Sequence, residues 1–94
     1  MGVRVMEGMG EEGAVAPGDT FEWENYSDSD CTITGTGNFL TLSTYLVLAK
    51  TGPESPGTTP ATVKSPLADG SYTYSASNSK KRSQPTIHVE SGKP

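Results

Sequence analysis

The sequence predicts an all-β protein, an antiparallel β-sandwich of about seven short strands. Hydrophobic residues make up only 32% of the 94 residues, while 11 are Gly and 7 are Pro. Such a composition is typical of short strands joined by turns. No stretch combines about 10–14 helix-forming residues with apolar positions at helical spacing. The length corresponds to one small domain over residues 1–94, in which we expect residues 1–13 and 91–94 to be loosely ordered.

The strand that organises the chain is expected to follow a Pro-Gly turn at residues 17–18. Asp19 is expected to hydrogen-bond the backbone that follows it, as Asp does in turns. The next residues alternate in polarity, so Phe21, Trp23 and Asn25 should share one face of a strand. The chain's single Trp stands in the middle of this row, where a small sandwich needs its largest core side chain.

The remaining strands are expected from shorter alternating runs. Ile87 and Val89 should face the core while His88 faces outward, and Tyr72 and Tyr74 should share one core-facing side near the Trp layer. The segment at residues 14–16 is expected to pair briefly with another strand before the turn at residues 17–18. We expect further strands at residues 3–6, 31–34, 61–64, 71–75 and 86–90, and loops at residues 7–13, 26–30, 35–38, 51–60 and 77–84.

The most apolar segment, residues 39–49, does not keep one apolar phase. Leu40 and Leu42 alternate, but residues 45–48 are apolar without interruption. A β-bulge, a break between two short strands or a single helical turn would each explain the change of phase.

The charge, the apolar runs and the cysteine count limit the partners, the location and the cross-links that we expect. The formal net charge is −4, and an acidic surface repels phosphate, so nucleic acid is not expected as a partner. No apolar run approaches the roughly 18 residues of a membrane span, and residues 1–10 do not resemble a signal peptide. We therefore expect a cytoplasmic monomer, or an exported or periplasmic one if a leader was removed. The single Cys31 excludes an internal disulfide.

Three motifs in order resemble the cupredoxin-like family of small β-sandwiches. They are Pro-Gly-Asp-Thr at residues 17–20, Trp-x-Asn at residues 23–25 and Gly-Ser-Tyr-Thr-Tyr at residues 70–74. The resemblance covers residues 14–90 in outline and implies a cupredoxin-like fold. The segment at residues 67–74 also resembles the closing strand of bacterial immunoglobulin-like repeats, which is the alternative fold.

The sequence departs from the family at its copper ligands. A blue-copper site uses two His, one Cys and usually a Met. The position that resembles the first His ligand holds Cys31, and the one that resembles the Cys ligand holds Ala76. The only His is His88, in the last strand, and all three Met lie in the first nine residues. The resemblance therefore implies a version of the fold without the copper centre and without any cofactor.

Cys31 and His88 are the remaining candidates for chemistry. An unconventional metal carrier could use the Cys31 thiolate with His88, or with Met6 and Met9. The preferred interpretation is a small buried hydrophobe at Cys31 and a solvent-facing His88, because two ligands do not complete a structural site.

Other polar groups are expected to be structural. Asp28 and Asp30 lack the rest of a calcium loop and should bond the loop backbone. The basic run at residues 80–82 should be a solvated hairpin tip. Tyr72 and Tyr74 should pack in the core rather than form a ligand platform.

No arrangement for nucleophilic catalysis or phosphate binding is present in the sequence, so an enzyme is not expected. The predicted function is a non-catalytic binding or structural module that acts through exposed loops at residues 51–60 and 77–84 on an unidentified protein or small-molecule partner. An adhesin-type repeat from a larger surface protein is a further alternative.

Overall fold

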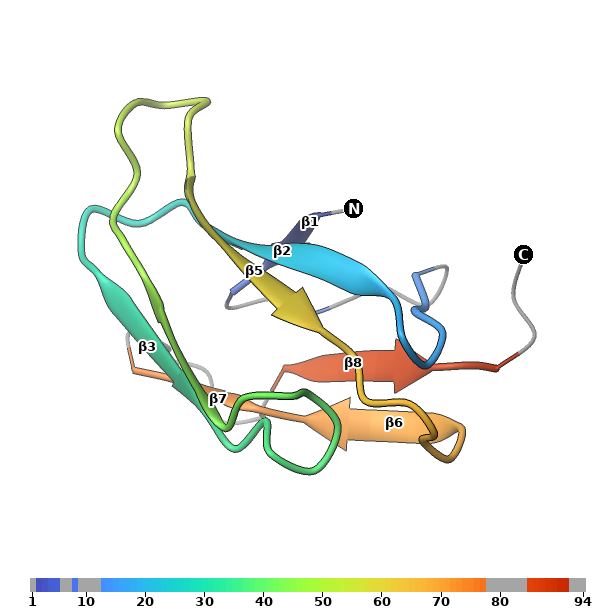
Figure 1. The fold of residues 1–94 in the computed structure, drawn as a ribbon. Helices are drawn as coiled ribbons and strands as arrows, with labels where there is room; N and C mark the ends of the chain where they lie inside the picture. The colour runs from blue at the N-terminus through green and yellow to red at the C-terminus, as the bar shows by residue number, and fades with distance from the viewer. Residues whose placement is uncertain (1, 6–7, 9–12, 78–84, 92–94) are drawn as a thin grey trace.

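The computed structural model describes residues 2–5, 8, 13–77 and 85–91, and these form an all-β protein without a helix. The eight strands are β1 (Gly2–Arg4), β2 (Thr20–Asn25), β3 (Cys31–Thr34), β4 (Thr44–Val47), β5 (Gly57–Thr62), β6 (Gly70–Thr73), β7 (Ser75–Ala76) and β8 (Thr86–Val89). In Figure 1, β2 and β5 lie on one side of the molecule and β3, β7, β6 and β8 on the other.

The strands pair in three small sheets. Their orders are β1-β2-β5, β4-β3-β7 and β6-β8. All pairs are antiparallel except β1 and β2, which run parallel with Val3 opposite Trp23. The prediction of an entirely antiparallel sandwich is therefore wrong at β1, which runs parallel to β2. A parallel pair requires a long connection, and residues 5–19 provide one.

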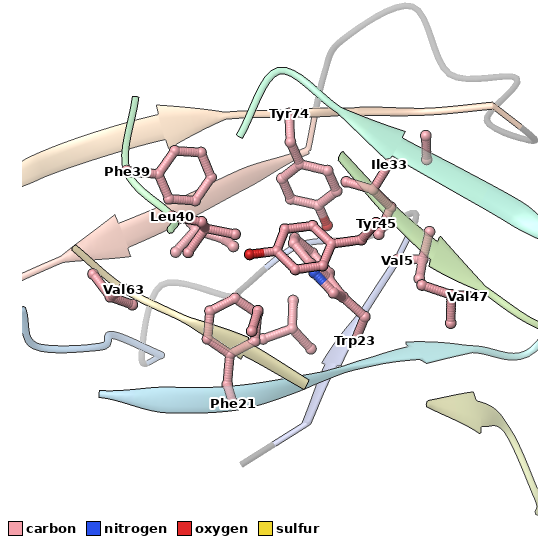
Figure 2. Packing of buried hydrophobic residues seen from close by; sticks show 14 of the residues in the cluster. Val5, Phe21, Trp23, Ile33, Phe39, Leu40, Tyr45, Val47, Val63 and Tyr74 are labelled. Atoms are coloured by element: carbon pink, nitrogen blue, oxygen red, sulfur yellow. The ribbon is translucent and has the colours of Figure 1, made fainter. Parts of the chain in front are cut away.

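The predicted central strand is confirmed as β2. Phe21, Trp23 and Asn25 are buried on one face, and Trp23 has no exposed surface. The Trp23 ring lies 4.6 Å from Tyr74, 5.1 Å from Phe21 and 6.0 Å from Tyr45, measured between ring centroids. Figure 2 shows these four rings at the centre of the hydrophobic cluster. Edge-to-face contacts of this kind add to the hydrophobic stabilisation.

Two sets of hydrogen bonds connect the sheets at their edges. On one side, Thr41 N donates to Thr62 O, and the side-chain Oγ1 of Thr59 donates to Leu46 O over 2.7 Å. On the other side, Val15 bonds to β8, which confirms the brief pairing expected at residues 14–16. The Thr59 bond therefore joins β5 to the free edge of β4.

The prediction of a loop at residues 51–60 is wrong for its last four residues, because Gly57–Thr62 forms the strand β5. Pro60 lies within this strand and has no backbone N–H to donate. Thr62 O accepts its hydrogen bond from Thr41, on the side away from β2. Because backbone groups alternate in direction, Pro60 presents its nitrogen to that same side, where β2 needs no donor.

The change of apolar phase at residues 39–49 comes from a break before β4. Leu40 forms an isolated bridge with Val63, and β4 begins only at Thr44. Tyr45 and Val47 are then buried, whereas Leu46 points outward. A break is therefore found, but a single bridge at Leu40 takes the place of the first of the two expected short strands.

Asp19 also differs from expectation, since it bonds the backbone that precedes it. Its Oδ2 accepts from Ala16 N over 2.9 Å, while its own N donates to Ala16 O. This reciprocal pair closes the turn at residues 17–18. Several expectations fall on residues outside the described ranges: Met6 and Met9, most of the loop expected at residues 7–13, residues 78–84 of the loop expected at 77–84 with its basic run, and the chain end at residues 92–94.

Candidate functional site

Cys31 begins β3 and is fully buried, with 0% of its surface exposed. It lies opposite Val47 of β4 and belongs to the same hydrophobic cluster as the central rings. Its Sγ is 3.9 Å from Ser77 Oγ and 3.8 Å from Thr32 O. The predicted burial of this thiol as a small hydrophobe is therefore confirmed.

His88 lies on β8 between two buried residues, and its ring faces the outer side of the strand, as expected. It pairs across the strands with Ser71 of β6, and its Nδ1 is 2.9 Å from Ser71 Oγ. Cys31 and His88 belong to different sheets, so no strand pairing brings them together. Within the described ranges, no group of three or more His, Cys, Asp or Glu side chains could hold a metal ion.

The two positions that resemble copper ligands lie on neighbouring strands. β3 pairs with β7, and Ile33 lies opposite Ala76. Cys31 and Ala76 both face the interior, as Ile33 does. The methyl group of Ala76 has no ligand atom, so this pair of positions supplies one sulfur at most.

The two Asp residues of the loop after β2 contact the segment that follows β4. Asp30 Oδ1 accepts from Ala49 N over 2.9 Å, so it bonds a backbone 19 residues further along the chain and not, as was expected, that of its own loop. Asp28 Oδ1 lies 3.6 Å from Lys50 Nζ. An exposed ion pair of this type contributes little to stability.

The two predicted core tyrosines have different neighbours. Tyr74 is buried against Trp23, and its hydroxyl donates to Arg4 O over 3.2 Å. Tyr72 is half-buried, stacks on Phe39 at 5.3 Å between ring centroids, and donates to Ala68 O over 2.6 Å. Packing is the role of both rings, as the sequence predicted.

Sequence reasoning missed a surface on the outer side of β3 and β4. Leu46 is 56% exposed and Leu48 is 58% exposed. Leu46 lies opposite Thr32, and Thr34 lies between Thr44 and Ser75. None of the six residues is charged, and we call this surface the leucine–threonine face: Thr32, Thr34, Thr44, Leu46, Leu48 and Ser75.

A signal for this face was present in the sequence. Once Tyr45 and Val47 are assigned to the core, strand alternation places Leu46 and Leu48 outside. The uninterrupted apolar run at residues 45–48 concealed that alternation, because all four residues could have been assigned to a buried strand.

Comparisons with protein-family models, with curated proteins and with solved structures found no match. Among the residues that the structure describes, no helix is long and apolar enough to cross a membrane.

Proposed function

We propose that this chain is a non-catalytic binding or structural module on a copper-free, cupredoxin-like scaffold. The observation that carries the proposal is the leucine–threonine face. Two leucines with more than half of their surface exposed stand side by side on an uncharged part of an acidic protein. Exposed apolar groups that gather on one face are typical of contact surfaces.

Two features support the cupredoxin-like part of the proposal. Residues 17–20 form a closed turn that leads into β2, and the Trp-x-Asn end of β2 points into the core. The two positions that resemble ligands, Cys31 and Ala76, face inward from paired strands. A bacterial immunoglobulin-like sandwich remains the alternative fold for the same set of strands.

The second candidate function, a metal carrier built on Cys31 with His88 or with Met6 and Met9, gains no support from the described residues. The Cys31 thiol is buried, and a metal carrier needs a thiolate that ions can reach. We therefore do not put it forward as the function, and we use it as the competing outcome of the test.

The test is a titration of the reduced protein with Cu(I), Cu(II) and Zn(II), followed by native mass spectrometry and absorption. Cys31→Ser removes the thiolate and keeps the thioethers of Met1, Met6 and Met9, so a loss of metal in this variant is due to Cys31. We expect no stoichiometric metal in either protein. One tightly bound ion per chain that is lost in Cys31→Ser would overturn the proposal and identify a cysteine-centred metal protein.

A further inference from the structure

We propose that Asp69–Gly70 is a site of covalent modification, where the chain forms a succinimide and then an isoaspartate, and that the Ser91 amide slows this reaction. The modification is independent of the proposed function, because it takes place within the backbone and needs only water. Three features of the molecule support it: the residue that follows Asp69, the place of both residues in the fold, and the hydrogen bond that holds the Asp69 carboxyl.

The reaction joins the Asp69 side chain to the backbone nitrogen that follows it. The Gly70 nitrogen attacks Cγ of the protonated Asp69 carboxyl, so an N–C bond forms and a C–O bond breaks. The hydroxyl group leaves as water and takes the amide proton with it. Water then opens the five-membered imide at either of its carbonyls, which returns Asp or gives isoaspartate, with the chain running through the side-chain carbonyl. One water leaves and one enters, so the product has the mass of the original chain and no oxidant is required.

The residue after Asp69 favours ring closure. Among the four Asp residues of the chain, Asp69 is the one followed by Gly, whereas the others precede Thr20, Ser29 and Cys31, whose side chains crowd the reacting nitrogen. At Gly70 nothing lies within 4 Å of the place that a Cβ would take, and φ is +155°, a conformation that residues with a side chain rarely adopt. The Gly70 nitrogen can therefore be approached without a side-chain clash.

Asp69 and Gly70 lie at a boundary of the fold that can open locally. Both residues are exposed, and Gly70 pairs with Val89 in the terminal pair of β6 and β8. The end of a ladder opens more readily than its interior. Asp30, by contrast, is followed by the fully buried Cys31 at the start of β3. Because ring closure requires the backbone at the reacting nitrogen to rotate, the fold permits the reaction at Gly70 more readily than at Cys31.

The Ser91 amide acts against the first step of the reaction. Ser91 N donates to Asp69 Oδ1 over 2.9 Å. This backbone hydrogen bond favours the carboxylate and lowers the pKa of Asp69. A carboxylate is a poor electrophile, because its oxygen cannot leave as water until it is protonated. Loss of the Ser91 donor should therefore speed up the modification.

The test is incubation of the full chain in water enriched in oxygen-18, in mildly acidic buffer at physiological temperature, followed by tryptic digestion. The peptide of residues 65–80 contains Asp69 as its single Asp. Each opening of the imide adds one oxygen-18 atom, and electron-transfer fragmentation distinguishes isoaspartate from Asp. Ser91→Pro removes the amide donor, and Ser91→Ala is the matched control that keeps it. We expect labelled isoaspartate at residue 69, formed about three- to tenfold faster in Ser91→Pro than in Ser91→Ala, which is the ratio that one hydrogen bond is worth.

Absence of label and of isoaspartate at residue 69, in the original chain and in Ser91→Pro, overturns the assignment of the site. Label that appears as fast at the exposed Asp28 also overturns it, because Asp28 precedes Ser29 and not Gly. Equal rates in Ser91→Pro and Ser91→Ala contradict the role of the Ser91 amide. A second measurement does not need the Pro variant: the folded Ser91→Ala protein should react more slowly than the same chain in urea, and equal rates would contradict protection by the fold.

Discussion

Replacement of Asn25 should destabilise the protein more than any other polar substitution in β2. Asn25 is 2% exposed and ends the central strand. Its Nδ2 lies 2.9 Å from Ser29 O, 3.1 Å from Val47 O and 3.2 Å from Leu48 O. Its Oδ1 accepts from Ser27 N over 3.0 Å and from Ser27 Oγ over 2.7 Å. The side chain thus ties β2 to the loop that follows it and to the end of β4.

The magnitude follows from these bonds. The two amide hydrogens and the carbonyl oxygen can form about four hydrogen bonds at once, each worth about 0.5–1.5 kcal/mol net. Asn25→Ala removes them and leaves buried backbone groups without partners, so we expect a loss of about 3–5 kcal/mol in the free energy of unfolding. Ser27→Ala is the matched control, because it keeps the Asn25 bonds to the carbonyls and should cost only about 1 kcal/mol.

Asn25→Asp provides a pH-dependent form of the same test. The new carboxylate would face the carbonyls of Ser29, Val47 and Leu48, so its folded pKa should lie above the ordinary value of about 3.9. Because the folded pKa is raised, the part of the penalty that comes from ionisation is absent below about pH 3.9 and grows as the pH rises through the folded pKa. The gap in stability between this variant and the original protein should therefore be smaller in acid than at neutral pH.

Urea unfolding monitored by Trp23 fluorescence measures all three variants at several pH values. A cost below about 1 kcal/mol for Asn25→Ala would refute the reasoning, since it would mean that these hydrogen bonds do not hold β2 to β4. A cost of Asn25→Asp that does not change with pH would refute the inference that the side chain at position 25 faces the three carbonyls.

Three further outcomes follow from the structure. Trp23→Ala should lower the free energy of unfolding by about 3–5 kcal/mol. Trp23→Phe should cost clearly less, because Trp23 Nε1 has no hydrogen-bond partner among the described residues and Phe therefore loses no hydrogen bond there. Chemical unfolding monitored by circular dichroism measures both variants. Gly57→Ala should destabilise strongly, because a Cβ there would overlap a backbone carbonyl, whereas Gly52→Ala, with its nearest neighbour at 3.7 Å, should cost little in the same assay. The Ser91 amide donates to Asp69 and lowers the pKa of that carboxyl, so the stability it contributes is present above the unfolded pKa and is lost as the pH falls through the folded pKa. In an NMR titration the Ser91 amide should shift with a midpoint below that of an ordinary Asp, and Asp69→Asn should abolish the shift.

The strands with regular alternation could be predicted from the sequence. The alternation around Trp23 gave the bounds and the buried face of β2, and the same pattern gave Ile87 and Val89 as core residues. These predictions held because one period-two pattern decides both the strand and its orientation. Burial of Cys31 agrees with the usual behaviour of a free Cys as a small hydrophobe, and the structure places it on the buried face of β3 with Ile33.

The errors arose where position in the sheet outweighed local sequence. Pro60 is compatible with β5 only because its nitrogen faces away from β2, and that direction depends on pairing that sequence alone does not show. The parallel pairing of β1 depends likewise on tertiary contacts. Leu46 and Leu48 could not be assigned to the surface while the start of β4 was undetermined, so the candidate contact face was not predicted.

The most direct test of the account is the metal titration of the reduced chain, read by native mass spectrometry beside Cys31→Ser. The Cys31 thiol is buried, and no three His, Cys, Asp or Glu side chains of the described ranges gather as metal ligands, so the account predicts no stoichiometric ion in either protein. One ion bound per chain and lost in Cys31→Ser would contradict the account.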